Sequence, residues 1–291
     1  MSLRTLAAVG LRLAAARALR LAAALPLLVA AALPLLLGTG PAAAQLPLFD
    51  AHIHYSRPDW DVYTPERVLS ILAQAGIRRA IVSSTPDDGT LKLYDKAPAG
   101  IVPFLRPYRT RDDMSSWTRD PTVAAYVEER LKRGVHRGIG EVHFGLNDVS
   151  APTVRRIAEL AGQHNLFLQC HVDEATVEAM LTTYPGVRIL WAHAGMSSPP
   201  AVVGRLLDRF PLLWVELSMR GDVAPGGTLD PDWKALFLRK PDRFMVGTDT
   251  WTTSRWEAVR GATAAVQQWL RQLPPDLAEQ IAYKNGERLF P

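Results

Sequence analysis

From residue 45 onward, short apolar runs alternate with longer stretches in which apolar residues recur at helical spacing. Eight of the short runs predict β-strands, at residues 48–55, 80–84, 101–107, 138–144, 166–172, 189–194, 213–217 and 244–248. Helical patterns lie between them, at residues 65–75, 121–133, 151–164, 173–183 and 201–210. Several strand runs are apolar almost throughout, which is typical of parallel strands buried on both faces. The segment 86–99 is ambiguous.

This alternation predicts a (β/α)8 TIM barrel. Eight units in residues 45–291 correspond to about 31 residues per unit, and such a barrel typically needs about 250 residues. A doubly wound open sheet is the alternative, but no G-x-G-x-x-G motif follows the first strand. No linker interrupts the pattern, so we expect a single domain. Its catalytic groups should lie at the carboxyl ends of the strands.

The first 44 residues have a different character. They contain four arginines and no acidic residue, an apolar run at residues 21–37, and the small residues Ala42, Ala43 and Ala44. This order is typical of a secretory signal peptide, and we expect cleavage after Ala44. An uncleaved membrane anchor is the alternative, because an apolar run of this length is near the lower limit for a span. We therefore predict an exported protein, periplasmic or secreted, with no stable membrane span after cleavage.

Composition and charge limit the classes of function that the sequence allows. Apolar residues make up 48% and charged residues 21% of the chain, the usual balance of a folded globular protein. Without the four N-terminal arginines, 29 basic residues face 29 acidic ones. The predicted domain therefore has no net charge to attract nucleic acid, and we expect a small-molecule substrate. The single cysteine, Cys170, excludes an intramolecular disulfide.

Candidate chemistry gathers at the ends of the predicted strands. His52 and His54 end the first strand and, two residues apart, point to the same face. Four further groups hold equivalent places on later strands: Glu141, His171, His193 and Asp249. A buried carboxylate is costly unless it is paired or binds a metal. The set therefore predicts a site for one or two divalent ions, with zinc as first choice and manganese, iron or nickel as alternatives.

Other polar residues near these strand ends have two interpretations. Arg106, Arg109 and Arg220 should lie at the mouth, where they either recognise an anionic substrate or form salt bridges at the rim. We take Arg106 and Arg220 as candidate substrate-binding residues. His143 shares the strand face of Glu141, and packing behind the site is its favoured interpretation. Three side chains are expected to be structural: His136, His164 and Cys170.

The order of these motifs resembles that of the amidohydrolase superfamily of metal-dependent hydrolases. The resemblance covers essentially the whole chain beyond residue 44. The segments Trp191-Ala-His193-Ala-Gly195, Gly247-Thr-Asp249 and Asn285-Gly-Glu-Arg-Leu-Phe290 resemble its amidohydrolase-2 branch. Gly140-Glu141 resembles the fourth-strand carboxylate of TatD-type members, whereas many superfamily members carry a carbamylated lysine there.

The resemblance implies a role for each strand-end group. The two histidines of the first strand and Asp249 would hold one metal ion. Glu141 would bridge to a second ion held by His171 and His193. In one-metal members, the fifth-strand histidine joins the first ion and the sixth-strand histidine stabilises the transition state. Asp249 would act as general base toward the metal-activated water, and His193 or the metal would polarise the scissile bond.

The expected function is therefore hydrolysis of a small amide, ester, lactone or related bond by a metal-activated water, with an anionic substrate as one option. Two other enzyme classes remain as alternatives, a TatD-like nuclease or phosphoesterase and a nonhydrolytic decarboxylase of the amidohydrolase-2 type. A noncatalytic metal- or ligand-binding barrel is the third alternative. A catalytic metal keeps an open coordination position, which distinguishes the enzyme from the carrier.

Overall fold

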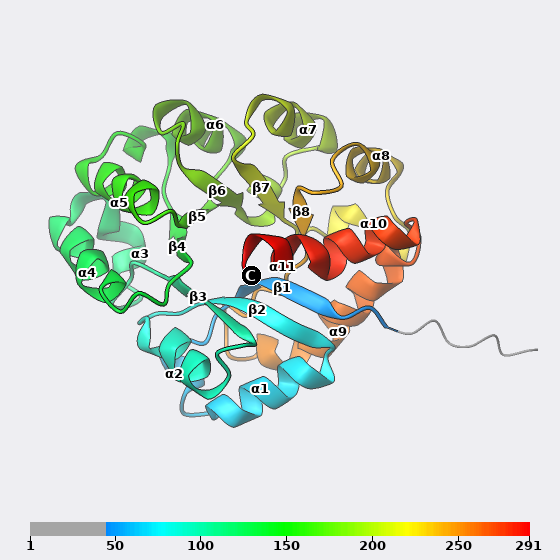
Figure 1. Ribbon diagram of the computed structural model, residues 1–291, viewed down its shortest axis with the longest axis horizontal. Helices are drawn as coiled ribbons and strands as arrows, with labels where there is room; N and C mark the ends of the chain where they lie inside the picture. The colour runs from blue at the N-terminus through cyan, green and yellow to red at the C-terminus, as the bar shows by residue number, and fades with distance from the viewer. Residues whose placement is uncertain (1–44) are drawn as a thin grey trace, which may run out of the picture. The chain divides into compact units, whose positions relative to one another are not determined.

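The computed structural model describes residues 45–291, and the predicted signal peptide at residues 1–44 lies outside the described residues. Eight parallel strands follow one another around a barrel in chain order (Figure 1). They are β1 (Leu48–Ile53), β2 (Ile77–Ser83), β3 (Ile101–Leu105), β4 (Gly138–His143), β5 (Phe167–His171), β6 (Arg188–Trp191), β7 (Leu213–Glu216) and β8 (Phe244–Met245). The Ala51 amide donates to the Val246 carbonyl and the Asp249 amide to the His52 carbonyl, each over 2.8 Å. These bonds join β1 to the segment after β8 and confirm the predicted (β/α)8 barrel.

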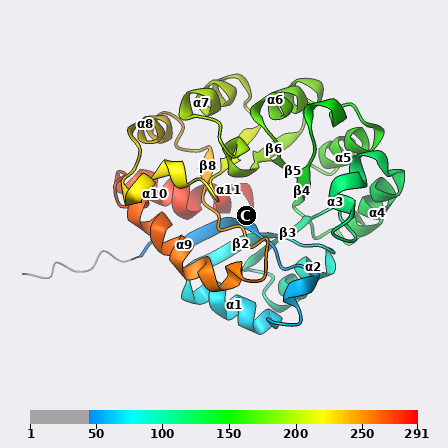
Figure 2. The same cartoon turned by 180° about the vertical axis from the view of Figure 1, so that it is seen from behind.

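Helices surround the strands, as Figure 2 shows from the opposite side. They are α1 (Pro65–Gln74), α2 (Asp88–Lys96), α3 (Asp113–Ser116), α4 (Pro121–Leu131), α5 (Pro152–Gln163), α6 (Glu174–Thr183), α7 (Pro200–Arg209), α8 (Pro231–Arg239), α9 (Arg255–Leu270), α10 (Pro275–Glu279) and α11 (Asn285–Leu289). Several begin with proline behind a capping side chain, as at Thr64 before α1 and Asp120 before α4. The ambiguous segment 86–99 contains α2. Among residues 45–291, none of the helices combines the length and apolarity that a membrane crossing requires.

Buried apolar residues form two clusters, one on each face of the strands. The larger cluster packs strands against helices and includes the buried thiol of Cys170, as its position in the strand predicts. The smaller cluster fills the barrel interior with Phe49, Ala51, Ile81, Val102, Phe104, Phe167, Leu190, Trp214, Met245 and Phe290. Phe290 follows α11, which lies across the centre of the strand ring in Figure 1. The ring centre of Phe290 is 5.9 Å from that of Phe49 and 5.0 Å from that of Phe167. Phe290 therefore closes the end of the barrel opposite the predicted site with an apolar side chain.

The last strand is shorter than the sequence predicts. Residues 244–248 were expected to pair, but only Phe244 and Met245 belong to β8. Beyond them the backbone amide of Thr248 donates to the Asp50 carboxylate over 3.1 Å, and its hydroxyl donates to the same group over 2.6 Å. Hydrogen bonds to the Asp50 side chain therefore supplement the backbone hydrogen bonds between β1 and this segment, at the point where the candidate site begins.

Candidate metal centre

His52 in β1 and His54, one residue beyond its end, turn their Nε2 atoms toward each other. His52 Nδ1 donates to Glu216 Oε2 over 2.8 Å, and His54 Nδ1 donates to the Ser83 carbonyl. Because a carboxylate and a carbonyl only accept, each neutral imidazole carries a lone pair on Nε2. The two Nε2 atoms are 3.1 Å apart, and both residues are 1% exposed. Two facing lone pairs in a buried site are satisfied by a cation placed between them.

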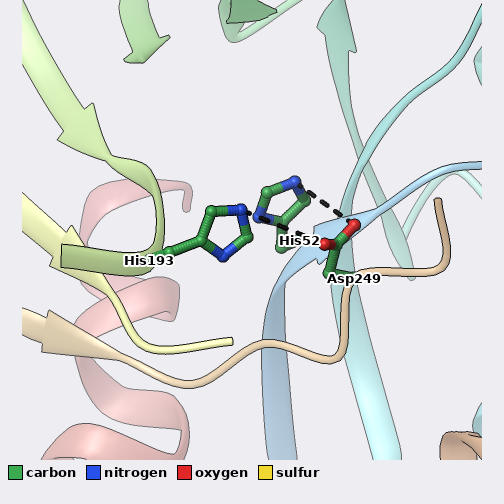
Figure 3. Close-up of side chains that lie close together, drawn as sticks. All are labelled: His52, His193 and Asp249. Atoms are coloured by element: carbon green, nitrogen blue, oxygen red, sulfur yellow. Dashed lines mark ion pairs between the residues drawn. The ribbon is translucent and has the colours of Figure 1, made fainter. Parts of the chain in front are cut away.

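His193 and Asp249 complete this arrangement from two other elements. His193 Nδ1 lies 3.0 Å from the Ser218 carbonyl, so its Nε2 is also free to bind, and it is 3.9 Å from Asp249 Oδ2. Asp249 Oδ1 lies 3.8 Å from His52 Nε2 and 3.5 Å from His54 Nε2. This buried oxygen accepts no hydrogen bond from residues 45–291. Figure 3 shows His52, His193 and Asp249 turned toward a common point.

Glu141, at the carboxyl end of β4, is surrounded by basic side chains. Six of them have a nitrogen within 3.6 Å of its carboxylate: His52, His54, Arg106, His143, His171 and His193. The closest contacts are from His171 Nδ1 to Oε1 and from Arg106 Nη2 to Oε2, each 2.8 Å. Burial alone would raise the pKa of Glu141, but His143, His52 and the other neighbours lower it well below its usual range. The group is therefore a stable carboxylate.

The buried acids create a field that favours positive charge. Burial opposes protonation of His52, yet the carboxylates of Asp249, Glu141 and Glu216 outweigh it and raise the pKa of His52 well above its usual value. Glu216 is fully buried, but the charge and hydrogen bond of His52 lower its pKa to about 2. A divalent cation would supply the charge that His52 otherwise takes up as a proton.

The donor atoms fit a divalent metal ion. Three sets of side chains bring their ligand atoms within 4.8 Å of one another: His52, His193 and Asp249; His52, His54 and Glu141; and Glu141, His143 and His171. The first two share His52 and form one centre, whereas the third adjoins it through Glu141. Imidazole nitrogen with carboxylate oxygen is the chemistry of zinc, manganese, iron and nickel sites. The structure thus brings together all six predicted ligands, and it places His143 beside them.

The predicted substrate-binding arginines have partners within the chain. Arg106 is paired with Glu141, and Arg109 with Asp113 and Asp120. Arg220 donates all five of its N–H groups to chain atoms: Asp222 Oδ1 and Oδ2 and the carbonyls of His193, Ala194 and Ser198. Binding of an anionic substrate by Arg106 and Arg220 stays a prediction, and the structure describes their contacts within the chain. These contacts occur because the neighbouring loops supply acidic and carbonyl acceptors.

The contacts of Arg220 support a strained turn at the site. His193 and Ala194 have φ angles of 55° and 46°, and Asp249 has a φ of 55°. Non-glycine residues rarely adopt this region, and each such residue costs of order 1–3 kcal/mol. Such a conformation persists only where the surroundings enforce it. The hydrogen bonds from Arg220 enforce this conformation in the turn that carries His193.

Sequence reasoning missed the residues that orient the ligands. Glu216 ends β7 after three apolar residues, which is the same signal that identified Glu141 on β4. Gly247 gives a second signal, because a Cβ there would lie 2.4 Å from Glu216 Oε1 and 3.0 Å from the Cβ of His52. Only glycine lets the segment after β8 pass so close to this pair. Ser218 supplies the carbonyl that orients His193.

Comparisons with known proteins identify the family and the fold of this chain. A sequence model of a family described as amidohydrolase matches residues 49–291. Among solved structures, a protein from Pseudomonas putida described as a 2-pyrone-4,6-dicarboxylic acid hydrolase superposes with a TM-score of 0.58 at 18% identity. That match covers 85% of this chain and 98% of the other. A TatD homologue from Escherichia coli K12 gives a TM-score of 0.58 at 16% identity, with coverages of 84% and 98%.

A third structure, from Acinetobacter baumannii, is described as a probable 2-pyrone-4,6-dicarboxylic acid hydrolase with citric acid bound. It gives a TM-score of 0.56 at 15% identity and covers 84% of this chain and 99% of that one. A search of curated proteins found no match. At these identities the structures establish the shared barrel, whereas the family model matches the sequence across nearly all of the described residues. The chain belongs to the amidohydrolase family of metal-dependent hydrolases.

Proposed function

We propose that the protein hydrolyses a small amide, ester, lactone or related bond with a divalent ion held by the strand-end residues. One observation carries the proposal. Asp249 Oδ1 is buried without a hydrogen-bond donor from residues 45–291 and faces the Nε2 atoms of His52 and His54, at 3.8 Å and 3.5 Å. A carboxylate placed this way can bind a metal and accept a proton beside it.

The ligand set would consist of His52, His54, Glu141, Asp249 and His193, with His171 on the far side of Glu141. A bound divalent ion lowers the pKa of a contacting water to about 7 and polarises a carbonyl oxygen. Asp249 would take the proton from the attacking water and return it to the leaving group. His193 directs its Nδ1 at the Ser218 carbonyl, so it has only Nε2 for the site. If this atom is protonated and does not bind the ion, it would instead donate a hydrogen bond to the carbonyl oxygen. Burial opposes its protonation, but Glu141 and Glu216 raise the pKa of His193.

Exposed apolar side chains in the loops around the site support the proposal that the substrate has an apolar part. Six large apolar side chains are exposed in residues 45–291: Val62, Leu146, Met196, Met219, Leu238 and Trp251. All but Leu238 lie in loops that follow a strand, at the end of the barrel that carries the ligands. Met219 follows Ser218 directly, and Trp251 is two residues beyond Asp249. We infer that an apolar part of the substrate would contact these loops, because they are on the end of the barrel that carries the ligands.

Metal analysis of the purified protein tests the proposal, followed by a panel of amide, ester and lactone substrates with and without chelator. We expect bound metal and an activity that chelator removes and metal restores. The double variant His52→Ala with His54→Ala should lose the metal while the barrel stays folded, because strand-end groups serve function more than stability. His164→Ala is the matched control, since His164 is exposed at the end of α5. A double variant that keeps its full metal content would refute the site.

We also propose that the protein is exported and acts outside the cytoplasm. The support is the sequence of residues 1–44, with its arginines, apolar run and small residues before Gln45. Mass spectrometry of the protein from its native cell envelope should show a chain that starts near Gln45. A full-length mass would favour a retained membrane anchor instead.

A further inference from the structure

A second group of metal-ligating side chains adjoins the centre described above. Ligand atoms of Glu141, His143 and His171 lie within 4.8 Å of one another, and the two imidazole ring centres are 4.4 Å apart. The side chains of the two histidines are 26% and 30% exposed, so this group lies closer to solvent than the first. Glu141 belongs to both groups. Occupation of the second group therefore depends on what else binds this carboxylate.

Arg106 places a permanent positive charge on the shared carboxylate. The residue is 5% exposed, and its Nη2 lies 2.8 Å from Glu141 Oε2. Its Nε donates to the Glu141 carbonyl over 3.4 Å, and its guanidinium lies 5.1 Å from the ring centre of Tyr108. Within residues 45–291, Glu141 is its one acidic partner. A guanidinium is not deprotonated in proteins, so this cation is present at every working pH.

We propose that Arg106 takes the place of a second metal ion. The protein then binds one divalent ion tightly, and the group of Glu141, His143 and His171 holds no second tight ion. The inference rests on the proposed function, because it assumes that the first centre binds metal. The guanidinium occupies a carboxylate oxygen that a second ion would need. It also repels a second cation at Glu141, because Arg106 and this carboxylate are buried and solvent screens charge weakly there.

Two substitutions at this position separate charge from hydrogen bonding. Arg106→Gln removes the charge and should open the second group, whereas Arg106→Lys keeps a cation there and should not. Arg109→Gln is the matched control. Arg109 follows the same strand but pairs with Asp113 and Asp120, and within residues 45–291 no ion pair or hydrogen bond joins it to Glu141.

The experiment is a calorimetric titration of metal-free protein with Zn²⁺, with metal content measured after gel filtration. The wild type, Arg106→Lys and Arg109→Gln should each retain one ion per chain. Arg106→Gln should bind a second ion at least tenfold more tightly than the wild type does. Adding His143→Ala to Arg106→Gln should abolish that gain, because His143 belongs to the second group.

The results of this titration distinguish failure of the inference about Arg106 from failure of the proposed function. Two tight ions in the wild type, or no gain in Arg106→Gln, would overturn the inference and leave the proposed function intact. A wild type that binds no metal would overturn the proposed function instead. If Arg106→Gln does not fold, as judged by circular dichroism, His143→Ala in the wild-type background decides. That variant should keep its one ion, and loss of an ion on this substitution would count against the role of Arg106.

Discussion

Glu216 offers the sharpest test of how the site is built, because it orients a ligand without being one of the predicted ligands. Its Oε2 accepts the Nδ1–H of His52 over 2.8 Å, and its Oε1 accepts the backbone N–H of Ser218. Glu216→Gln keeps the shape but turns one oxygen into an NH2 group. In either orientation of the new amide, its NH2 group faces the Nδ1–H of His52 or the backbone N–H of Ser218. One of these two N–H groups therefore loses its acceptor.

The expected loss in metal affinity is about 10- to 100-fold, the usual effect of removing the partner of a metal-bound imidazole. This corresponds to roughly 1.4–2.7 kcal/mol. The assay is competition for Zn²⁺ against a chromophoric chelator at fixed pH and ionic strength. Glu257→Gln is the matched control, since Glu257 is exposed on α9 and forms none of the ion pairs recorded in residues 45–291. If Glu216→Gln folds and keeps wild-type affinity within twofold, Glu216 does not position His52.

Four further predictions follow from the same contacts. Asp249→Asn should retain most of the metal while kcat falls by about 10²–10⁴-fold, and full activity at saturating metal would exclude the general-base role. Metal affinity should rise with pH, because protonated His52 cannot bind an ion and its pKa is raised; titrations at pH 6 and pH 8 measure this. Trp251→Ser should weaken binding of a long-chain alkyl hydroxamate more than of acetohydroxamate, whereas Leu238→Ser should affect neither. Burial raises the pKa of Asp50 to about 7 from 3.8, so the folded state keeps a proton that the unfolded chain releases, and stability should fall as pH rises through that range. Asp50→Asn should remove roughly 3 kcal/mol of this dependence between pH 5 and pH 8, as urea unfolding of the metal-free protein at these two pH values would show.

The groups that bind could be predicted from sequence because each one ends a buried strand. An acid or histidine at the end of an apolar run has no ordinary role in a core, so His54, Glu141 and Asp249 were visible without a structure. Glu216 carried the same signal on β7, but its partner His52 is 164 residues away. Their contact depends on how β7, β8 and β1 meet around the barrel. Local pattern does not contain that information.

The contacts of the arginines within the chain could not be predicted for a different reason. Sequence places Arg106 and Arg220 at the correct end of the barrel, but it does not show how many donors remain for a ligand. That number depends on loop conformation. The turn after β6 directs the carbonyls of His193, Ala194 and Ser198 at Arg220, and the loop after β7 adds Asp222. The guanidinium therefore stabilises the turn that carries a ligand.

One end of the barrel is packed with apolar side chains that stabilise the fold, and the other end carries the candidate site. The end closed by Phe290 is filled with aromatic rings, whereas the opposite end holds the carboxylates of Glu141, Glu216 and Asp249 around the imidazoles. Without a metal, these acids raise the pKa of His52, so a proton supplies part of the missing charge. A divalent ion supplies more charge at the same atoms, and an ion at 1,000 times its Kd stabilises the folded state by about 4 kcal/mol. Metal binding would be coupled to folding in this chain, because the residues proposed to bind the ion are strained or like-charged without it.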